Sequence, residues 1–284
     1  MPVDALTGDG AGWSRLEGTR WGPVVQLAET TSTNSVLLSE ALAGAPEGLV
    51  AVADYQTAGR GRFDRRWASP PGTSLLFSVL LRPHANELPL GRRHLAVAAV
   101  SLAVAEAAGI VAGVDLALKW PNDLVVARGR HRDGKVAGVL AETAPATGAK
   151  APDNGPAIVI GVGLNVKWAP PGTTATSLEA VAAGPVDRGE LLVESLLALD
   201  RLYGHWEVVS RRYRDGCATL RREVTISFAT DVDPGGPPEL RGTALDVDDD
   251  GRLVVRTGAG DLVKVAAGDV THAIMARPSR VFEQ

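Results

Sequence analysis

A segment rich in glycine and arginine, residues 56–67, carries the residue types most suited to binding an anion. It reads Gln-Thr-Ala-Gly-Arg-Gly-Arg-Phe-Asp-Arg-Arg-Trp, with four arginines within seven residues. Gly59 and Gly61 allow the backbone to approach a ligand closely, and the planar guanidinium of arginine suits phosphate oxygens or a carboxylate. Because a solvated basic loop or an RNA-contacting patch would have the same composition, all three interpretations stay open for this segment alone.

Three further short segments could contribute to the same chemistry. Residues 118–123 end in Asn122 and Asp123, whose side chains could face a magnesium ion or a phosphate, or simply form the corner between two strands. Lys135 opens an apolar strand and could point its ammonium at a phosphoryl group or extend it to solvent. Residues 160–166 hold two glycines within an apolar strand, which indicates close approach of a ligand or another backbone rather than a dinucleotide-binding motif.

The hydrophobic pattern predicts the elements that must hold these segments in place. A short helix is expected over 35–42, opened by the hydroxyl and amide side chains of residues 30–34. A buried, alanine-rich helix is expected over 93–108, ended by Gly109, and an amphipathic helix over 190–214. Short apolar runs predict strands over 49–53, 74–81, 116–120, 124–127, 136–142 and 157–166.

The C-terminal part of the chain has a different pattern, in which apolar and polar residues alternate, as in Val-Thr-Ile-Ser-Phe at 224–228. Turn sequences separate several such runs, which predicts a small all-β module over residues 221–284. The predicted fold class is therefore α+β, with a mixed β-sheet and helices over residues 21–220 followed by this module. Residues 1–20 are rich in glycine and are expected to form a loose N-terminal arm.

Composition and charge exclude several classes of protein. The 284 residues include 45% apolar and 22% charged residues, as in ordinary globular proteins. A net charge of -4 gives no overall attraction to nucleic acid or to an anionic membrane, so an anion site has to be local. The single cysteine, Cys217, excludes an internal disulfide and is expected to be a small buried side chain. The longest apolar stretch, Leu95–Ala108, is interrupted by Ser101 and Glu106 and is judged too short to span a bilayer.

Five motifs occur in an order that is more informative than any one of them. They are Ser32-Thr33-Asn34, Gly-Arg-Gly-Arg at 59–62, Lys-Trp-Pro-Asn-Asp at 119–123, Gly-Lys-Val-Ala-Gly at 134–138 and Gly-Val-Gly-Leu-Asn at 161–165. In this order they strongly resemble the catalytic domain of the biotin–protein ligases, over roughly residues 20–220. The resemblance implies a class II synthetase-like catalytic domain that binds biotin and ATP, followed by a small SH3-like β-barrel.

The resemblance also assigns roles to individual residues, with Lys135 and Arg62 in the catalytic role. The implied biotin-binding residues are Ser32, Thr33, Asn34, Gln56, Arg60, Gly61, Arg62 and Lys135. The implied residues for ATP and the adenylate are Arg62, Arg65, Trp67, Asn122, Lys135 and Asn165. Hydroxyl and amide groups supply both the donors and the acceptors that a bicyclic urea needs. Asp123 is the candidate ligand of Mg²⁺.

The implied reaction has two steps. ATP and biotin, with Mg²⁺, give biotinyl-5′-AMP and pyrophosphate, and biotin then passes to a lysine of a biotin carboxyl carrier protein domain of a biotin-dependent carboxylase. We expect a cytoplasmic enzyme, since no secretion signal is visible, and a monomer or weak homodimer. Neither DNA nor a membrane is expected as a partner, because the charge is negative and no N-terminal DNA-binding domain is seen.

Two alternatives and one departure from the family remain open. A lipoate or octanoate ligase or transferase shares the fold and also modifies a carrier lysine, although Gln56 together with the Gly-Arg-Gly-Arg run favours biotin. A non-catalytic module that binds nucleic acid or peptide could be built on the arginine-rich segment and the β module. Asp64 stands where many relatives have a small residue, and it could pair with a neighbouring arginine.

Overall fold

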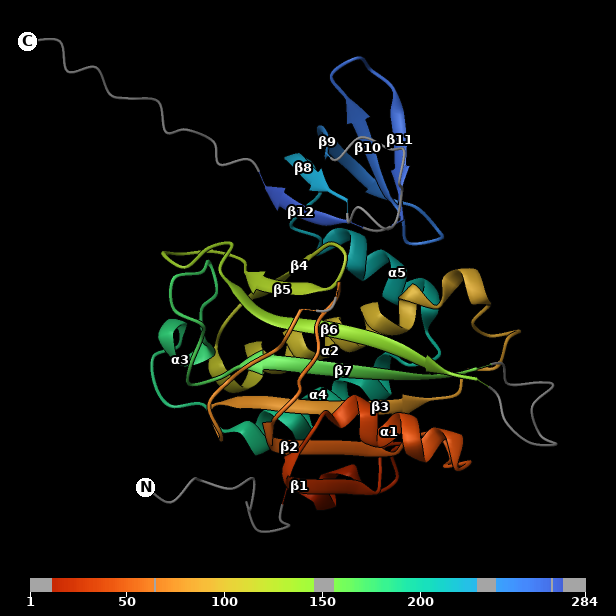
Figure 1. The fold of residues 1–284 in the computed structure, drawn as a ribbon, viewed down its shortest axis with the longest axis vertical. Coiled ribbons are helices and arrows are strands. Elements are labelled where there is room, and N and C mark those ends of the chain that lie inside the picture. The colour runs from red at the N-terminus through yellow and green to blue at the C-terminus, as the bar shows by residue number, and fades with distance from the viewer. Residues whose placement is uncertain (1–11, 64, 146–155, 229–238, 267, 273–284) are drawn as a thin grey trace, which may run out of the picture. The chain divides into compact units, whose positions relative to one another are not determined.

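The chain folds into two compact units, Met1–Ala218 and Thr219–Gln284 (Figure 1). The computed structural model describes residues 12–63, 65–145, 156–228, 239–266 and 268–272. The boundary between the units lies two residues before the one that the sequence analysis drew after residue 220. Asp64 and most of the loop expected at 144–156 lie outside the described residues.

A seven-stranded mixed sheet forms the centre of the first unit, which confirms the predicted α+β class. Its strand order is β1-β2-β3-β7-β6-β5-β4, with β1 parallel to β2 and the other neighbouring pairs antiparallel. The strands are β1 (Val24–Thr30), β2 (Val50–Gln56), β3 (Ser74–Leu81), β4 (Leu116–Lys119), β5 (Asp123–Val126), β6 (Lys135–Ala144) and β7 (Ala157–Asn165). Strand β1 was not predicted, because this edge strand has no buried residue and therefore no apolar run.

Helices cover both faces of this sheet (Figure 1). The helices are α1 (Thr33–Leu42), α2 (His94–Ala112), α3 (Leu178–Val181), α4 (Arg188–Leu202) and α5 (Trp206–Asp215), with 3-10 turns at Trp13–Leu16 and Leu90–Arg92. On one face α1 packs through Leu37 into a buried cluster with Leu80 and Val159. On the other face α2 and α4 pack against each other. Because side chains alternate along a strand, every strand supplies one set of residues to each face.

The apolar helix α2 is longer than the sequence predicts. It ends at Gly113, whose left-handed φ of 64° closes the helix, and not at Gly109. By length and composition Leu90–Ala112 would pass as a membrane span, so the judgement that it is too short is wrong. However, 61% of its most apolar window is buried inside the fold. The helix therefore serves as a core element of the first unit.

The amphipathic stretch predicted as one helix over 190–214 is two helices, α4 and α5. The break lies at Tyr203 and Gly204, where Gly204 has a left-handed φ of 87°. The apolar face continues across the break, since the rings of Tyr203 and Trp206 meet at 5.1 Å between centroids. The periodicity therefore identified the buried face correctly but not the turn. Cys217, after α5, is buried as predicted.

The described part of the predicted N-terminal arm is packed and not loose. Trp13–Leu16 form a 3-10 turn in which Leu16 is buried. Arg15 forms an ion pair with Glu190 of α4 at 2.6 Å. The expectation of a loose arm is wrong for these residues, because an apolar side chain and an ion pair fix them to α4. Residues 1–11 lie outside the described part of the chain.

The second unit is a five-stranded antiparallel sheet, as the all-β prediction requires. Its order is β11-β10-β9-β8-β12. The strands are β8 (Glu223–Ser227), β9 (Glu239–Val247), β10 (Leu253–Thr257), β11 (Leu262–Val265) and β12 (Asp269–His272). Alternate residues such as Val224, Ile226 and Val255 are buried, which explains the period-two pattern of the sequence. The finer SH3-like assignment stays a prediction.

Candidate functional site

A floor of glycines lies on the sheet face that carries α1. Gly138 of β6 is paired with Gly163 of β7, and Gly161 lies two residues before Gly163 in β7. A Cβ added at Gly161 would lie 2.2 Å from Asn34 Oδ1, and one at Gly163 would lie 2.4 Å from the ring of Trp67. These separations are too short for any side chain, so the glycines mark close contacts, as their place in a strand indicated.

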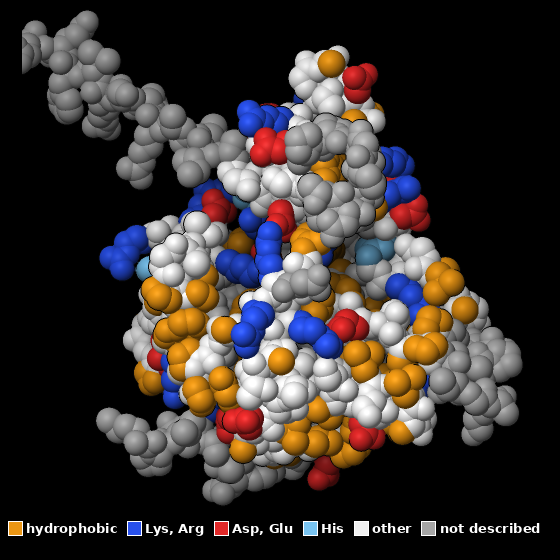
Figure 2. Space-filling view, in the orientation of Figure 1, with side chains coloured by type: hydrophobic (Ala, Val, Ile, Leu, Met, Phe, Trp, Pro, Cys, Tyr) orange, Lys and Arg blue, Asp and Glu red, His pale blue; other side chains and the backbone are white. Residues whose placement is uncertain are grey.

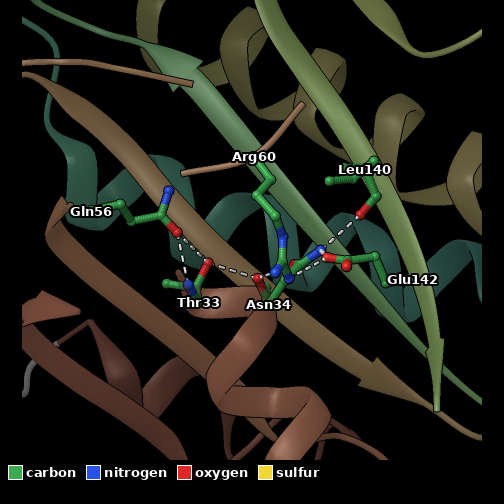
Figure 3. Close-up of polar contacts among 7 residues, drawn as sticks. Thr33, Asn34, Gln56, Arg60, Leu140 and Glu142 are labelled. Atoms are coloured by element: carbon green, nitrogen blue, oxygen red, sulfur yellow. Dashed lines mark hydrogen bonds and ion pairs between the residues drawn. The ribbon is translucent and has the colours of Figure 1, made fainter. Parts of the chain in front are cut away.

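Hydrogen bonds connect the start of α1 to β2 and β6 beside this floor (Figure 3). The backbone nitrogen and Oγ1 of Thr33 lie 2.7 and 3.1 Å from Gln56 Oε1. Asn34 Nδ2 donates to Glu142 Oε2 at 2.7 Å and to Leu140 O at 3.2 Å. Thr33 and Asn34 are each only 3% exposed. The polar cluster, as we call this group, comprises Thr33, Asn34, Gln56, Ser78 and Glu142.

Ser78 completes the polar cluster from β3, and it was not among the predicted site residues. Its Oγ lies 2.6 Å from Asn34 Oδ1 and 2.7 Å from Thr33 Oγ1, and the residue is fully buried. The single hydroxyl proton of Ser78 can be donated to only one of these two acceptors at a time. The hydroxyls of Ser78 and Thr33 therefore form one chain of hydrogen bonds that ends on the side-chain oxygens of Asn34 and Gln56. A serine at an inward position of an otherwise apolar strand was the available signal.

The glycine- and arginine-rich segment folds as a narrow hairpin over the same face. Gly61 N donates to Arg65 O at 2.6 Å, and Trp67 N donates to Gly59 O at 2.9 Å. A Cβ at Gly59 would lie 2.5 Å from Trp67 O, so the hairpin requires glycine at this position. Figure 2 shows Lys and Arg side chains gathered on this face, where Figure 1 draws the hairpin in front of β6 and β7.

Two arginines connect the hairpin to the strands. Arg60 Nη2 lies 2.9 Å from Glu142 Oε2 and thereby joins the polar cluster (Figure 3). Arg62 Nη1 donates to Asn122 Oδ1 over a longer distance, 3.4 Å. The guanidinium of Arg62 also lies 4.8 Å from the centroid of the Phe63 ring. The hairpin is thus held at one point by a short ion pair and at the other by a long hydrogen bond.

Trp67 ends the hairpin with its indole against the glycine floor. Ring atoms would lie 2.4 Å from a Cβ at Gly163 and 3.1 Å from one at Gly138. Lys135 Nζ lies 5.7 Å from the ring centroid, within range of a cation–π interaction. The indole Nε1 is buried without a hydrogen-bond partner among the residues that the structure describes. The ring therefore offers an ordered aromatic surface beside a lysine.

Lys135 stands at the head of β6 and forms an ion pair with Asp123 Oδ1 at 2.7 Å. Its side chain is 36% exposed. Its backbone is held by a neighbouring segment, because Lys135 N donates to Thr174 O at 3.2 Å and Thr176 N donates to Lys135 O at 2.8 Å. The cationic cluster, as we call this group, comprises Arg62, Asn122, Asp123 and Lys135.

The two clusters lie at neighbouring positions along the floor. The side-chain oxygen of Asn34, in the polar cluster, lies against Gly161, whereas the ring of Trp67, beside Lys135, lies against Gly163. Two residues along a strand correspond to about 7 Å. This spacing suits a small ligand with an uncharged polar head at one end and an anionic group at the other.

The remaining predicted site residues differ from one another in burial and in hydrogen bonding. Ser32 is buried and precedes α1 as its N-cap residue, while Arg65 is exposed on the hairpin. Asn165 is 2% exposed, and its amide donates to Thr176 O at 3.2 Å. Since Thr176 also holds the backbone of Lys135, Asn165 supports the strand end on which Lys135 stands.

The described residues include no group of three or more His, Cys, Asp or Glu side chains that could hold a metal ion. Asp123, the candidate for Mg²⁺, is the one carboxylate of the cationic cluster, and it lies against the ammonium of Lys135. One carboxylate beside a cation does not make a resident metal site. It fits an ion that is carried mainly by the phosphates of a nucleotide.

Comparisons with known proteins agree with this geometry. Residues 25–165 match the biotin/lipoate A/B protein ligase family, and residues 235–272 match the biotin protein ligase C terminal domain. A biotin--[acetyl-CoA-carboxylase] ligase of Mycobacterium tuberculosis is 36% identical over 276 residues, covering 95% of this chain and 93% of that protein. The chain belongs to the biotin/lipoate A/B protein ligase family.

A second relative and a solved structure also match most of the chain. A biotin--[acetyl-CoA-carboxylase] ligase of Paracoccus denitrificans is 32% identical over 257 residues, covering 85% of this chain and 97% of that protein. The structure of the biotin protein ligase from Aquifex aeolicus in complex with biotin and ATP has a TM-score of 0.68 at 24% identity, covering 89% of this chain and 99% of that one. The resemblance seen in the sequence, and the biotin protein ligase fold that it implied, are confirmed, while the SH3-like assignment stays a prediction.

Proposed function

We infer that this protein is a biotin–protein ligase, which forms biotinyl-5′-AMP from biotin and ATP and transfers biotin to a lysine of a biotin carboxyl carrier protein domain. The observation that carries this inference is the polar cluster beside the cationic cluster on one glycine floor, in a chain 36% identical to a biotin--[acetyl-CoA-carboxylase] ligase. The match of residues 235–272 to a biotin protein ligase domain favours biotin over lipoate.

The polar cluster binds the ureido head of biotin. Asn34 Oδ1 and the hydroxyls of Thr33 and Ser78 supply acceptors and donors in a setting that is almost closed to water. Because these groups are already held by one another, little conformational freedom is lost when the ligand binds. Ser32 and Gln56 complete this end of the biotin site.

The cationic cluster carries the first chemical step. A carboxylate oxygen of biotin attacks the α-phosphorus of ATP, the bond from that phosphorus to the bridging oxygen breaks, and pyrophosphate leaves. Lys135 and Arg62 stabilise the negative charge that grows on the phosphoryl oxygens. Alignment of the carboxylate and the phosphorus on one floor removes much of the entropic barrier. Asn122, which receives a hydrogen bond from Arg62, positions that guanidinium.

Magnesium, when bound with ATP, would neutralise charge on the phosphate oxygens, and such an ion would need only one or two carboxylates of the protein. Asp123 is the candidate carboxylate, and because it pairs with Lys135 through Oδ1, its second oxygen would be the one to face the ion.

The hairpin protects the intermediate, which is a mixed anhydride that water hydrolyses. Arg60, Gly61, Arg62 and Arg65 lie over the anhydride, and Trp67 stacks near the adenine. In the second step a lysine amine of the carrier domain attacks the carbonyl carbon of the anhydride and AMP leaves. The enzyme works in the cytoplasm, and its second unit is an SH3-like domain.

Biotin-dependent exchange of labelled pyrophosphate into ATP tests this function directly. If the protein is a biotin–protein ligase, pyrophosphate exchange should occur with biotin and not with lipoate. Its melting temperature should also rise with biotin plus MgATP and not with lipoate plus MgATP. Exchange that depends on lipoate would instead identify a lipoate ligase. Salt-sensitive RNA binding without exchange would identify a nucleic-acid-binding module.

A further inference from the structure

We propose that Glu142 is a positioning residue that fixes the Asn34 amide as a hydrogen-bond acceptor for the ligand and connects the hairpin to the polar cluster. The proposal rests on the proposed function, because it concerns how that site selects its ligand. Glu142 lies on β6, outside the five motifs, and no role follows for it from the resemblance. Its carboxylate contacts both Asn34 and Arg60.

The orientation of the Asn34 side chain follows from the chemistry of its neighbours. Its nitrogen faces Leu140 O at 3.2 Å and Glu142 Oε2 at 2.7 Å. A backbone carbonyl and an ionised carboxylate carry no proton, so only the NH₂ group of the amide can face both. Asn34 Oδ1 must therefore lie on the opposite side, where Ser78 Oγ is 2.6 Å away.

An amide oxygen has two lone pairs, and Ser78 occupies one of them. The second remains for a ligand that brings an N–H group. The ureido ring of biotin carries such groups, whereas the dithiolane ring of lipoate carries none. Glu142 thus helps to decide, through Asn34, which head group the site accepts.

The same carboxylate oxygen binds the hairpin. Arg60 Nη2 lies 2.9 Å from Glu142 Oε2, which also receives the Asn34 hydrogen bond (Figure 3). The Glu142 side chain is 28% exposed and that of Arg60 is 44% exposed, so solvent weakens this ion pair. The pair is therefore easily broken, and because both donors share Oε2, the Arg60 contact and the Asn34 hydrogen bond depend on the same Glu142 side chain.

The test measures KM for biotin, KM for ATP and kcat of the intact protein in the pyrophosphate-exchange assay for Glu142→Gln, Arg60→Ala and the double variant. A glutamine can keep its amide oxygen at the Oε2 position but carries no charge, so both hydrogen bonds lose their charge assistance and KM for biotin should rise about tenfold. We expect kcat and KM for ATP to stay within about twofold of wild type. Arg60→Ala should add little in the Glu142→Gln background, because both changes weaken the same contact.

The matched control is Glu106→Gln on α2. Its carboxylate also receives two arginine hydrogen bonds, from Arg201 at 2.6 Å and Arg212 at 3.0 Å, and it lies outside the site. This variant should leave all three kinetic parameters unchanged. Glu142→Asp, which keeps the charge, should recover part of the biotin affinity that Glu142→Gln loses.

Three outcomes would overturn the proposal for Glu142. These are an unchanged KM for biotin in Glu142→Gln, equal increases in KM for biotin and for ATP, and independent effects of Arg60→Ala and Glu142→Gln. A general loss of structure would lower the melting temperature and kcat together, which the biotin-specific effect does not predict. If the wild-type protein itself shows no biotin-dependent exchange, the proposed function fails instead.

Discussion

The polar cluster and the cationic cluster share one glycine floor but differ in how firmly they are held. In the polar cluster Asn34 is 3% exposed and Ser78 is fully buried, with contacts of 2.6 to 2.7 Å. In the cationic cluster Lys135 is 36% exposed, and the bond from Arg62 to Asn122 is 3.4 Å long. The polar cluster, which recognises the biotin head in the proposed function, is therefore preorganised. The cationic cluster, which acts in the proposed reaction, can rearrange.

This difference follows from what each end has to do in the proposed reaction. A neutral ring is identified by fixed donors and acceptors, whose order reduces the entropy lost on binding. A phosphoryl group gains charge during the reaction, so the cations that stabilise it have to face its oxygens. Lys135 pairs with Asp123 and is exposed enough to contact a phosphoryl oxygen as well. Five substitutions, taken from the largest expected effect to the smallest, test the division.

Lys135→Ala should give the largest effect. Removal of the ammonium takes away a charge that stabilises the transition state, so biotin-dependent pyrophosphate exchange should fall by about 100-fold or more. KM for biotin should change far less, since the polar cluster is intact. Lys264→Ala in the second unit is the control, with an unchanged rate. A near-normal rate in Lys135→Ala would remove this residue from the catalytic role.

Gly161→Ala and Gly163→Ala should separate the two ends of the floor. A methyl group at Gly161 meets Asn34 Oδ1 at 2.2 Å and should raise KM for biotin by about 10- to 100-fold through overpacking. A methyl group at Gly163 meets the Trp67 ring at 2.4 Å and should raise KM for ATP. Gly109→Ala, with no atom within 4 Å of its Cβ, should change neither. Identical kinetic profiles for Gly161→Ala and Gly163→Ala would contradict the division.

Ser78→Ala should weaken biotin binding by about five- to tenfold, because a buried amide oxygen loses its donor. Steady-state kinetics should place the change in KM for biotin and not in kcat. Ser101→Ala is a matched control, since Ser101 is also buried and its Oγ donates within α2 to Val97 O at 2.9 Å. A decrease in kcat with KM for biotin unchanged would mean that Ser78 does not act in recognition.

Arg62→Ala should give the smallest of these effects, measured as leakage of the adenylate. Loss of a long contact from the hairpin should increase leakage of biotinyl-5′-AMP into solvent by about three- to fivefold, the scale of one weak charged contact. The released adenylate can be followed by chromatography after a single turnover. Arg128→Ala, whose partner Asp115 lies on a different hairpin, serves as control. Unchanged leakage would argue against a protective role for Arg62.

Local sequence features predicted the parts of the molecule that depend on neighbours in the chain. The run at 74–81 matches β3 without error, and the Gly-Arg-Gly-Arg run marks a hairpin that requires glycine at residue 59. The order of five motifs identified the family. These features depend on turn geometry, strand alternation and residue chemistry, which short segments carry by themselves.

Contacts between distant segments were decided only by the tertiary structure. Ser78 and Glu142 read as ordinary residues of strands, and they become part of the site because β3 and β6 flank β7 beneath the start of α1. The turn at Gly204 and the pairing of Lys135 with Asp123 were equally hidden. A hydrogen bond between residues 108 positions apart, as between Asn34 and Glu142, leaves no periodic signal in a single sequence, because sheet register alone brings the two together.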